Sequence, residues 1–198
     1  MRRGLVFAPF AAIAIAVAVA AAAQAAPSAY TIDPHHTQIQ FGWNHFGFSH
    51  ITGRFDQVDG TFLFDPDAPT RSQIAVSIPI ASISTGVADL DKDLLSDGFF
   101  DAAKYPTATF KSTSVKSTGK DTLAVSGDLS IHGVTRPVTL DVTINRIGEH
   151  PMGGGAAAGF DASTTIQRSD FGISKYVPKV SDQIQIHITM ETRAAKKI

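Results

Sequence analysis

The sequence predicts an all-β protein, folded as an antiparallel eight-stranded barrel with one short helical lid segment. Polar and apolar residues alternate in segment after segment, turn-forming stretches separate the segments, and only one stretch has helical spacing. Because successive side chains of a strand point to opposite sides of the sheet, each segment has one apolar and one polar face. Repeated along the chain, this pattern is typical of a curled antiparallel sheet that can close around a cavity.

The first alternating segment covers residues 37–45. Ile39, Phe41, Trp43 and His45 share one face of the expected strand, whereas the positions between them are polar or glycine. We expect the apolar face to point into the barrel.

Seven further segments repeat the alternation. They are residues 53–64, 73–84, 107–115, 122–131, 134–146, 159–168 and 182–191. Short connections such as Gly133 favour antiparallel order. With the first segment they give about eight strands, and closure of so large a sheet removes its exposed edges.

One segment, residues 89–105, departs from the strand pattern. Leu90 and Leu94 stand four residues apart among charged residues, which predicts a short helix, and Pro106 prevents any continuation. Phe99 and Phe100 follow the helix after a turn-like stretch, so we expect this segment to close one end of the barrel as a lid. The Gly- and Ala-rich residues 152–159 predict a mobile connection between strands.

The first 25 residues have the composition of a secretory signal peptide. Arg2 and Arg3 precede an uncharged apolar stretch and a small-residue run that ends near Ala26. We therefore expect cleavage of residues 1–25, a single barrel domain over residues 26–198, and a periplasmic protein. An uncleaved anchor is the alternative, because the apolar stretch is long enough to span a bilayer. The twin arginines do not decide between the two export routes.

Composition excludes several classes of protein. The chain has 17 basic and 18 acidic residues, and loss of Arg2 and Arg3 with the leader leaves a net charge of about −3. The basic residues are scattered, so we expect no nucleic-acid partner. The absence of cysteine means that the core alone must stabilise the exported domain.

Several short motifs, in order along nearly the whole mature chain, resemble those of the YceI-like family. The motifs are Tyr30 to Asp33 with His36; His45-Phe46-Gly47 with Gly53-Arg54-Phe55; Phe99-Phe100-Asp101; Tyr105-Pro106 with Phe110; residues 127–138; and Arg168 to Gly172. The resemblance implies a lipocalin-like barrel, exported to the periplasm, that binds long isoprenoid or related lipids and is often dimeric. A carrier of this kind is expected to contact a membrane transiently. Trp43 stands where an aliphatic residue is common in the family, and we expect it to narrow the cavity.

The candidate lipid-binding residues are mainly aromatic side chains at inward strand positions or in the lid. They are Phe41, Trp43, His45, Phe55, Phe62, Phe99, Phe100, Phe110, Phe160, Arg168, Phe171 and Tyr176. An eight-stranded barrel can either be filled by its own side chains or hold one slender ligand. The alternation of inward and outward positions is compatible with a filled barrel and with a hollow one, and only the family resemblance favours a cavity.

Two polar candidates, His45 and Arg168, lie at the ends of predicted strands. Such positions lie at a barrel rim, where they could contact the phosphate or quinone head of a lipid whose tail lies inside. The alternative is a structural role, in which Asp170, Asp97 or Asp101 pairs with the arginine, because an unpaired buried charge is costly.

Enzymatic functions have little support in the sequence. The chain contains no nucleophile elbow, phosphate-binding loop or dinucleotide fingerprint. Asp89, Asp91 and Asp93 resemble the start of a calcium loop but lack its glycine and final glutamate. His35 and His36 are expected to point apart on a strand and predict no metal site. We expect a lipid-binding protein without catalysis or cofactor, with an envelope hydrolase or metal-dependent enzyme using rim histidines as the alternative.

Overall fold

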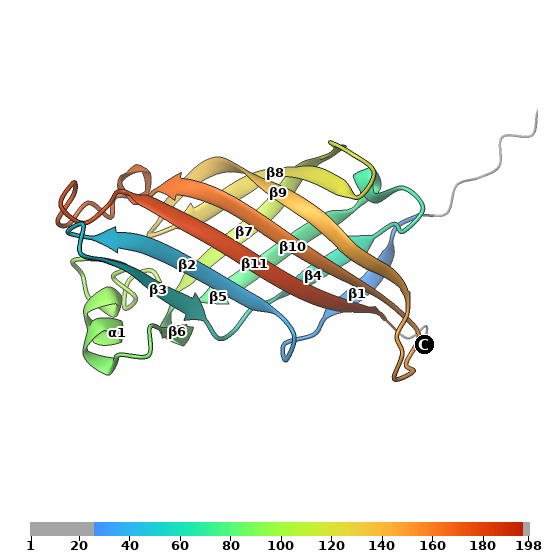
Figure 1. Cartoon of the computed structure of the whole chain (residues 1–198), viewed down its shortest axis with the longest axis horizontal. Coiled ribbons are helices and arrows are strands. Elements are labelled where there is room, and N and C mark those ends of the chain that lie inside the picture. The colour runs from blue at the N-terminus through green and yellow to red at the C-terminus, as the bar shows by residue number, and fades with distance from the viewer. Residues whose placement is uncertain (1–25, 196–198) are drawn as a thin grey trace, which may run out of the picture.

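Eleven strands form one antiparallel sheet in the computed structural model, which describes residues 26–195 (Figure 1). The strands are β1 (Ser28–Ile32), β2 (Gln38–His45), β3 (Ser49–Phe55), β4 (Asp59–Phe64), β5 (Gln73–Pro79), β6 (Ile83–Ser84), β7 (Thr107–Ser117), β8 (Thr122–Ile131), β9 (Val134–Glu149), β10 (Ala156–Gln167) and β11 (Gln183–Ala194). The helix α1 (Ala88–Leu95) and the 3-10 turns η1 (Pro69–Arg71), η2 (Ile80–Ser82) and η3 (Arg168–Phe171) complete the described elements.

Eight of these strands close into a barrel. Their order is β1-β4-β5-β7-β8-β9-β10-β11, and β1 pairs again with β11 through Tyr30–Ala194, Thr31–Arg193 and Ile32–Thr192. The predicted all-β class and eight-stranded antiparallel barrel are therefore confirmed.

The remaining strands split away from the ring at one end. Along one edge β11 pairs with β1 near its C-terminus and with β2 nearer its start, from Gln185–Gly42 to Thr189–Gln38. β2 continues to β3 and the two-residue β6, and α1 lies beside this extension (Figure 1). The barrel is thus closed by hydrogen bonds at the β1 end and widened at the end that carries α1, which we call the helix end.

The strand boundaries differ from the expected ones in several places. Residues 73–84 form β5, the turn η2 and β6 rather than one strand, because the chain leaves β5 after Pro79. β10 begins at Ala156, so the expectation of a mobile connection over residues 152–159 was wrong for its last four residues. Residues 53–64 form two strands rather than one, because the chain leaves the sheet at residues 56–58. β1 was not predicted as a strand, although it closes the ring. β10 ends at Gln167, so Arg168 is the first residue of η3 and not the last of a strand. The predicted helix is confirmed as α1, whereas the predicted leader lies outside the described residues.

The β8–β9 turn connects the lid segment to η3. His132 and Gly133 both have positive φ, and the His132 ring lies 4.7 Å from the Tyr105 ring. A hydrogen bond of 3.1 Å joins His132 Nδ1 to the Phe171 carbonyl. One tight turn therefore positions both the end of the lid segment and the start of the loop after η3.

No helix among residues 26–195 is both long and apolar enough to cross a membrane.

Gly133→Ala is expected to lower the free energy of unfolding by about 1–3 kcal/mol. The backbone has φ +75° there, and an added Cβ would lie 2.5 Å from Cε1 of Tyr105. Urea denaturation followed by far-UV circular dichroism measures the change.

Gly86→Ala is the matched control, because Gly86 has φ +78° but no atom within 4 Å of its virtual Cβ. Its cost should be limited to backbone strain, about 1 kcal/mol. Equal losses in the two variants would show that the contact with Tyr105 contributes nothing.

Candidate functional site

The barrel encloses a cavity of about 470 Å³. Its lining comes from all eight ring strands, together with β2, β3, α1 and the loop after η3, and it is overwhelmingly apolar. Ligand pockets for small molecules in proteins have volumes of about 300–1,000 Å³, so the cavity is large enough to hold one.

The burial pattern independently indicates a hollow barrel. Inward apolar side chains in the middle of the strands, such as Val76, Leu140, Ala162 and Ile186, are only partly buried although they point away from bulk solvent. In a filled core such side chains would be close-packed against one another. The structure therefore supports the hollow alternative and contradicts the filled one.

Glycines opposite aromatic residues allow two rings to lie flat against the wall. A Cβ at Gly53 would lie 2.6 Å from Cζ of Phe41, its cross-strand partner, and one at Gly127 would lie 2.5 Å from Cζ of Phe110. Each ring occupies the volume that a side chain on the neighbouring strand would otherwise fill. This arrangement places aromatic surface on the wall without filling the lumen.

A cluster of rings forms the floor of the cavity at the β1 end. Phe64 packs edge-on against Tyr30 and Phe160 with ring centroids 5.3 Å apart, and Phe62 lies 5.5 Å from Phe160. All four rings are buried, Phe64 to 1% exposure. The floor limits how far an apolar tail can extend.

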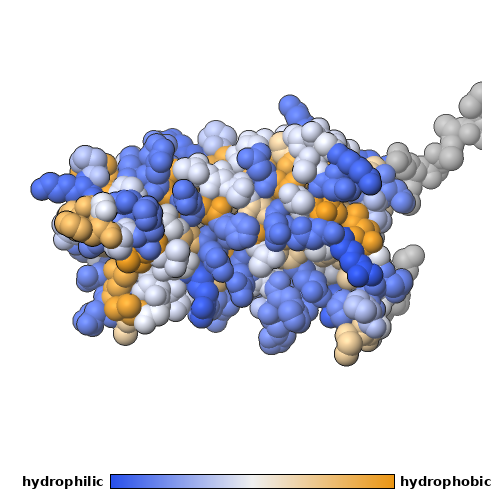
Figure 2. All heavy atoms as spheres, in the orientation of Figure 1, coloured by the Kyte–Doolittle hydropathy of each residue, from blue (hydrophilic) through white to orange (hydrophobic). Residues whose placement is uncertain are grey.

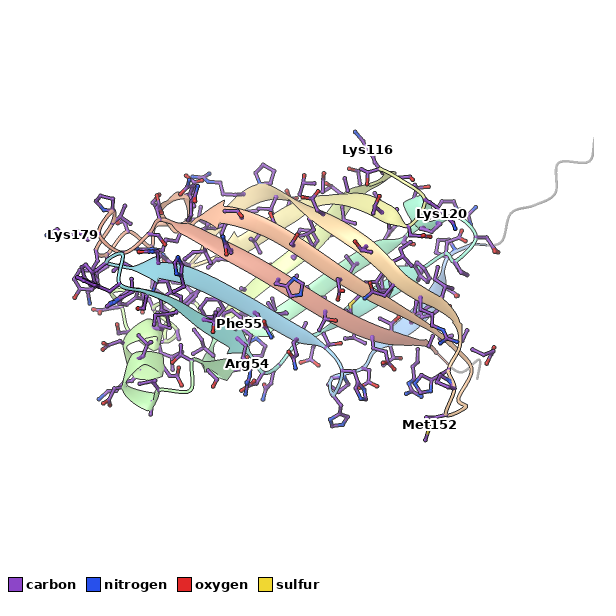
Figure 3. The ribbon with its side chains drawn as sticks, viewed as in Figure 1. Arg54, Phe55, Lys116, Lys120, Met152 and Lys179 are labelled. Atoms are coloured by element: carbon purple, nitrogen blue, oxygen red, sulfur yellow. The ribbon has the colours of Figure 1, made fainter. Side chains whose placement is uncertain are left out.

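The lid residues line the opposite end. Leu94 of α1 is buried in a cluster with Phe41 and Ile83, and Phe100 lies edge-on to Phe55 at 6.0 Å. The position of Phe55 on the extension is visible in Figure 3. Trp43 stacks on Phe41 at 5.8 Å and lines the same end of the cavity.

Four of the exposed lining residues, His45, Asp93, Lys175 and Tyr176, lie at the helix end, and we call this part of the cavity the mouth. Lys175 Nζ lies 5.0 Å from the centre of the Phe99 ring and 5.2 Å from that of Tyr176. Within residues 26–195 no carboxylate forms a salt bridge with it. Sequence analysis missed Lys175 because it lies in a loop without periodicity.

Arg168 lines the cavity but is held by backbone carbonyls. Its Nε, Nη1 and Nη2 donate to the carbonyls of Ser181, Ile173 and Val180 at 2.9, 2.9 and 3.1 Å. Burial lowers the pKa of Arg168, and the nearby Asp182 opposes this shift. The candidate partners Asp170, Asp97 and Asp101 do not pair with it, so that expectation was wrong. The geometry indicates a side chain that organises the loop after η3.

His45 lies at the mouth, where β2 ends. It is exposed, its ring lies 4.5 Å from that of Phe46, and its backbone forms a bridge with Val180. The structure thus places all the candidate lipid-binding residues in the cavity lining, including Phe171 at its buried edge. Their contact with a lipid stays a prediction.

The histidine pair lies in the turn between β1 and β2, so the expectation that His35 and His36 point apart on a strand was wrong. Potential ligand atoms of Asp33, His36 and Glu191 lie within 4.8 Å of one another. However, the Arg193 guanidinium lies 3.9 Å from Asp33 and 3.5 Å from Glu191, where it already supplies positive charge. A hydrogen bond from His36 lowers the pKa of Asp33. The cluster is an ion-pair network that braces the point where β1 and β2 diverge.

A hollow antiparallel barrel with an apolar lumen and a partly polar mouth defines the class of small barrels that can enclose an apolar ligand. The chain belongs to the YceI-like family, whose YceI-like domain matches residues 30–192. A "UPF0312 protein" of Pseudomonas syringae pv. tomato is 43% identical over 183 residues, which are 91% of this chain and 94% of that protein.

Two solved structures show the same architecture. Burkholderia cenocepacia BcnA superposes with a TM-score of 0.73 at 26% identity, over 81% of this chain and 98% of that one. A domain described as polyisoprenoid-binding, from Saccharophagus degradans, superposes with a TM-score of 0.65 over 85% and 99% of the two chains. At 17% identity, this second likeness concerns the fold alone.

Gly53→Ala is expected to weaken binding of a long apolar fluorescent probe roughly tenfold, because the Phe41 ring must move into the lumen. Fluorescence titration of the purified, delipidated protein measures the affinity. Gly148→Ala is the control, since no atom lies within 4 Å of its virtual Cβ. Unchanged affinity in Gly53→Ala would show that the ring is accommodated elsewhere.

Arg168→Met is expected to lower the free energy of unfolding by about 2–4 kcal/mol, because three carbonyls lose their donors. Arg168→Lys should rescue little of this loss, since an ammonium cannot reproduce the planar fork. Full rescue by lysine in a urea titration would contradict the structural role.

Proposed function

We propose that this protein binds and carries a long apolar lipid, an isoprenoid such as a polyprenyl phosphate or an isoprenoid quinone, in the periplasm. The tail lies inside the barrel and the head at the mouth. The observation that carries the proposal is the apolar cavity of about 470 Å³ between the aromatic floor and the exposed mouth residues. Family membership and the shared fold with a polyisoprenoid-binding domain support the choice of ligand class.

The lumen can supply the affinity without polar contacts. Burial of about ten methylene groups contributes about 8 kcal/mol to the binding free energy before the costs of association are subtracted. A longer prenyl chain adds to this in proportion to the area buried. Flat rings on the wall, such as Phe41 and Phe110, suit a slender chain because they present surface without crossing the lumen.

Lys175 is the group best placed to recognise the head of the lipid. It is exposed at the mouth and forms cation–π contacts with Phe99 and Tyr176 rather than a salt bridge. A cation without a carboxylate partner can bind a phosphate oxygen, whereas the donors of Arg168 already serve carbonyls. This favours an anionic head over a neutral one, and His45 is a second donor at the same rim.

We propose binding without catalysis. The one charged side chain buried in the lining, Arg168, has a structural hydrogen-bonding role, and the histidine cluster around Asp33 lies at the divergence of β1 and β2 rather than in the lining. Neither observation favours the hydrolase or metal-enzyme alternative.

Organic extraction of the purified full-length protein, followed by mass spectrometry, tests the proposal directly. A prenyl lipid at about one molecule per chain is expected. The same extraction from preparations expressed with and without added isoprenoid distinguishes cargo from contamination. Repeated absence of any prenyl lipid would contradict carriage.

Lys175→Gln is expected to weaken binding of a prenyl phosphate by roughly tenfold, while binding of the matching prenyl alcohol changes little. The glutamine keeps most of the side-chain volume that packs beside Phe99 and Tyr176. Lys104→Gln is the control, because Lys104 is also exposed but does not line the cavity. Equal losses for phosphate and alcohol would mean that Lys175 does not contact the head.

A further inference from the structure

Two neighbouring loops at the helix end carry exposed aromatic side chains, and two of these side chains lie outside the cavity. Phe46 and Phe48, in the β2–β3 turn, are 45% and 93% exposed, and Tyr176, in the loop after η3, is 56% exposed. Phe46 and Phe48 are absent from the cavity lining. We call these three residues, together with Lys175 and Lys179, the aromatic tip.

Hydrogen bonds hold the two loops together. The Phe46 amide donates to the Lys179 carbonyl at 3.1 Å, the Ser181 amide donates to the Asn44 carbonyl, and the Asn44 amide donates to the Ser181 hydroxyl, the last two at 3.0 Å each. The Asn44 side chain also accepts a hydrogen bond of 2.7 Å from the Gly47 amide. The exposed rings are therefore presented by a braced structure, so little ordering is required before they bind something.

These two loops carry positively charged side chains and no negatively charged ones. Residues 37–55 and 171–181 contain no Asp or Glu, whereas the tip carries Lys175 and Lys179. The acidic residues nearest these loops lie on α1 and the turn after it, at Asp89, Asp91, Asp93 and Asp97, and at the two ends of the loop after η3, where Asp170 belongs to η3 and Asp182 accepts hydrogen bonds from Ser169. Figure 3 shows Lys179 at the extreme of the helix end, and Figure 2 shows hydrophobic surface beside hydrophilic surface there.

Exposed aromatic rings beside lysines, with no carboxylate among them, match the requirements of a bilayer containing anionic phospholipid. The rings enter the headgroup region, and the lysines meet lipid phosphates. The same arrangement suits a soluble protein partner less well, since interface cores are generally depleted in lysine.

We propose that the aromatic tip docks the protein on an anionic phospholipid bilayer, with the mouth facing the membrane. The inference deepens the proposed function and rests on it: His45, Lys175 and Tyr176 line the mouth, so docking through this tip would let an apolar tail pass between bilayer and cavity without crossing water. The acidic helix is repelled by the same surface, so the molecule rests on the tip and not on α1.

Sedimentation with vesicles tests the proposal with the intact mature protein. The probes are vesicles of phosphatidylcholine alone and of phosphatidylcholine mixed with phosphatidylglycerol. Wild-type protein is expected to bind the mixed vesicles at least tenfold more tightly than the neutral ones. Phe48→Ser and Lys179→Glu should each weaken binding to the mixed vesicles by roughly tenfold.

The opposite end of the molecule offers matched controls. Met152 is 87% exposed in the β9–β10 loop, and Lys120 is exposed in the β7–β8 loop, both far from the tip (Figure 3). Met152→Ser and Lys120→Glu repeat the same losses of apolar surface and charge and should leave binding unchanged. Equal effects from both ends would overturn the proposal.

The readout separates this inference from the proposed function. Tip variants that lose vesicle binding while wild-type protein yields extracted prenyl lipid would support docking. Wild-type protein that carries lipid but ignores mixed vesicles would overturn docking and leave carriage intact, whereas vesicle binding without any extractable lipid would leave docking intact and remove carriage. Concentration-dependent dimerisation that Phe48→Ser abolishes, in the absence of vesicle binding, would assign the tip to a second copy of the chain and overturn the proposal.

Discussion

The pairing of β11 is the constraint on which the rest of the structure depends. One edge of this strand pairs with β10 along its whole length, while the other edge changes partner from β2 to β1. Where the partner changes, the chain turns through residues 33–37, and the Asp33 amide still reaches the Glu191 carbonyl at 2.9 Å. Because β1 then pairs with β4 and β2 with β3, the wall divides at this point. A ring closed by hydrogen bonds at one end and widened at the other follows from that division, and so do the aromatic floor and the accessible mouth.

Closure alone does not make a barrel hollow, since eight strands can be filled by their own side chains. Here the large rings pack in two ways that spare the axis. At the floor Tyr30 and Phe160 both pack edge-on against Phe64, whereas on the wall Phe41 lies across Gly53 and Phe110 across Gly127. The floor concentrates aromatic volume at the narrow end and stabilises the closure, and the flat rings leave the middle of the lumen to aliphatic side chains that are only partly buried. Stability and available volume are thus supplied by different parts of one inner face.

Period-two alternation is a local property, and it was sufficient to predict the eight-stranded barrel and the strand residues among the cavity candidates. Phe99, Phe100, Phe171 and Tyr176 lie outside the strands and were not predicted from it. It was insufficient for β1, in which only Tyr30 and Ile32 face inward, too few to show a period. The interruption of the strand at residues 56–58 can be recognised in the sequence, because the inward-facing positions change from odd-numbered at Phe55 to even-numbered at Phe62. The positions of Lys175 and of the carbonyl partners of Arg168 could not be predicted from the sequence for another reason. They lie in the loop after η3, whose path depends on hydrogen bonds to distant turns rather than on any repeating pattern.

The structure separates affinity from selectivity. Apolar burial is non-directional and grows by about 0.8 kcal/mol per methylene, so the lumen favours any slender tail and discriminates mainly by length against the aromatic floor. Discrimination between heads requires directional groups, and Lys175 and His45 are exposed for this at the mouth. Neither the lumen nor the mouth residues determine where the lipid enters or leaves, because a long tail that leaves an apolar lumen must enter either water or another apolar phase. The aromatic tip lies outside the cavity but adjoins the mouth, so it is the element whose chemistry can make that second phase a membrane.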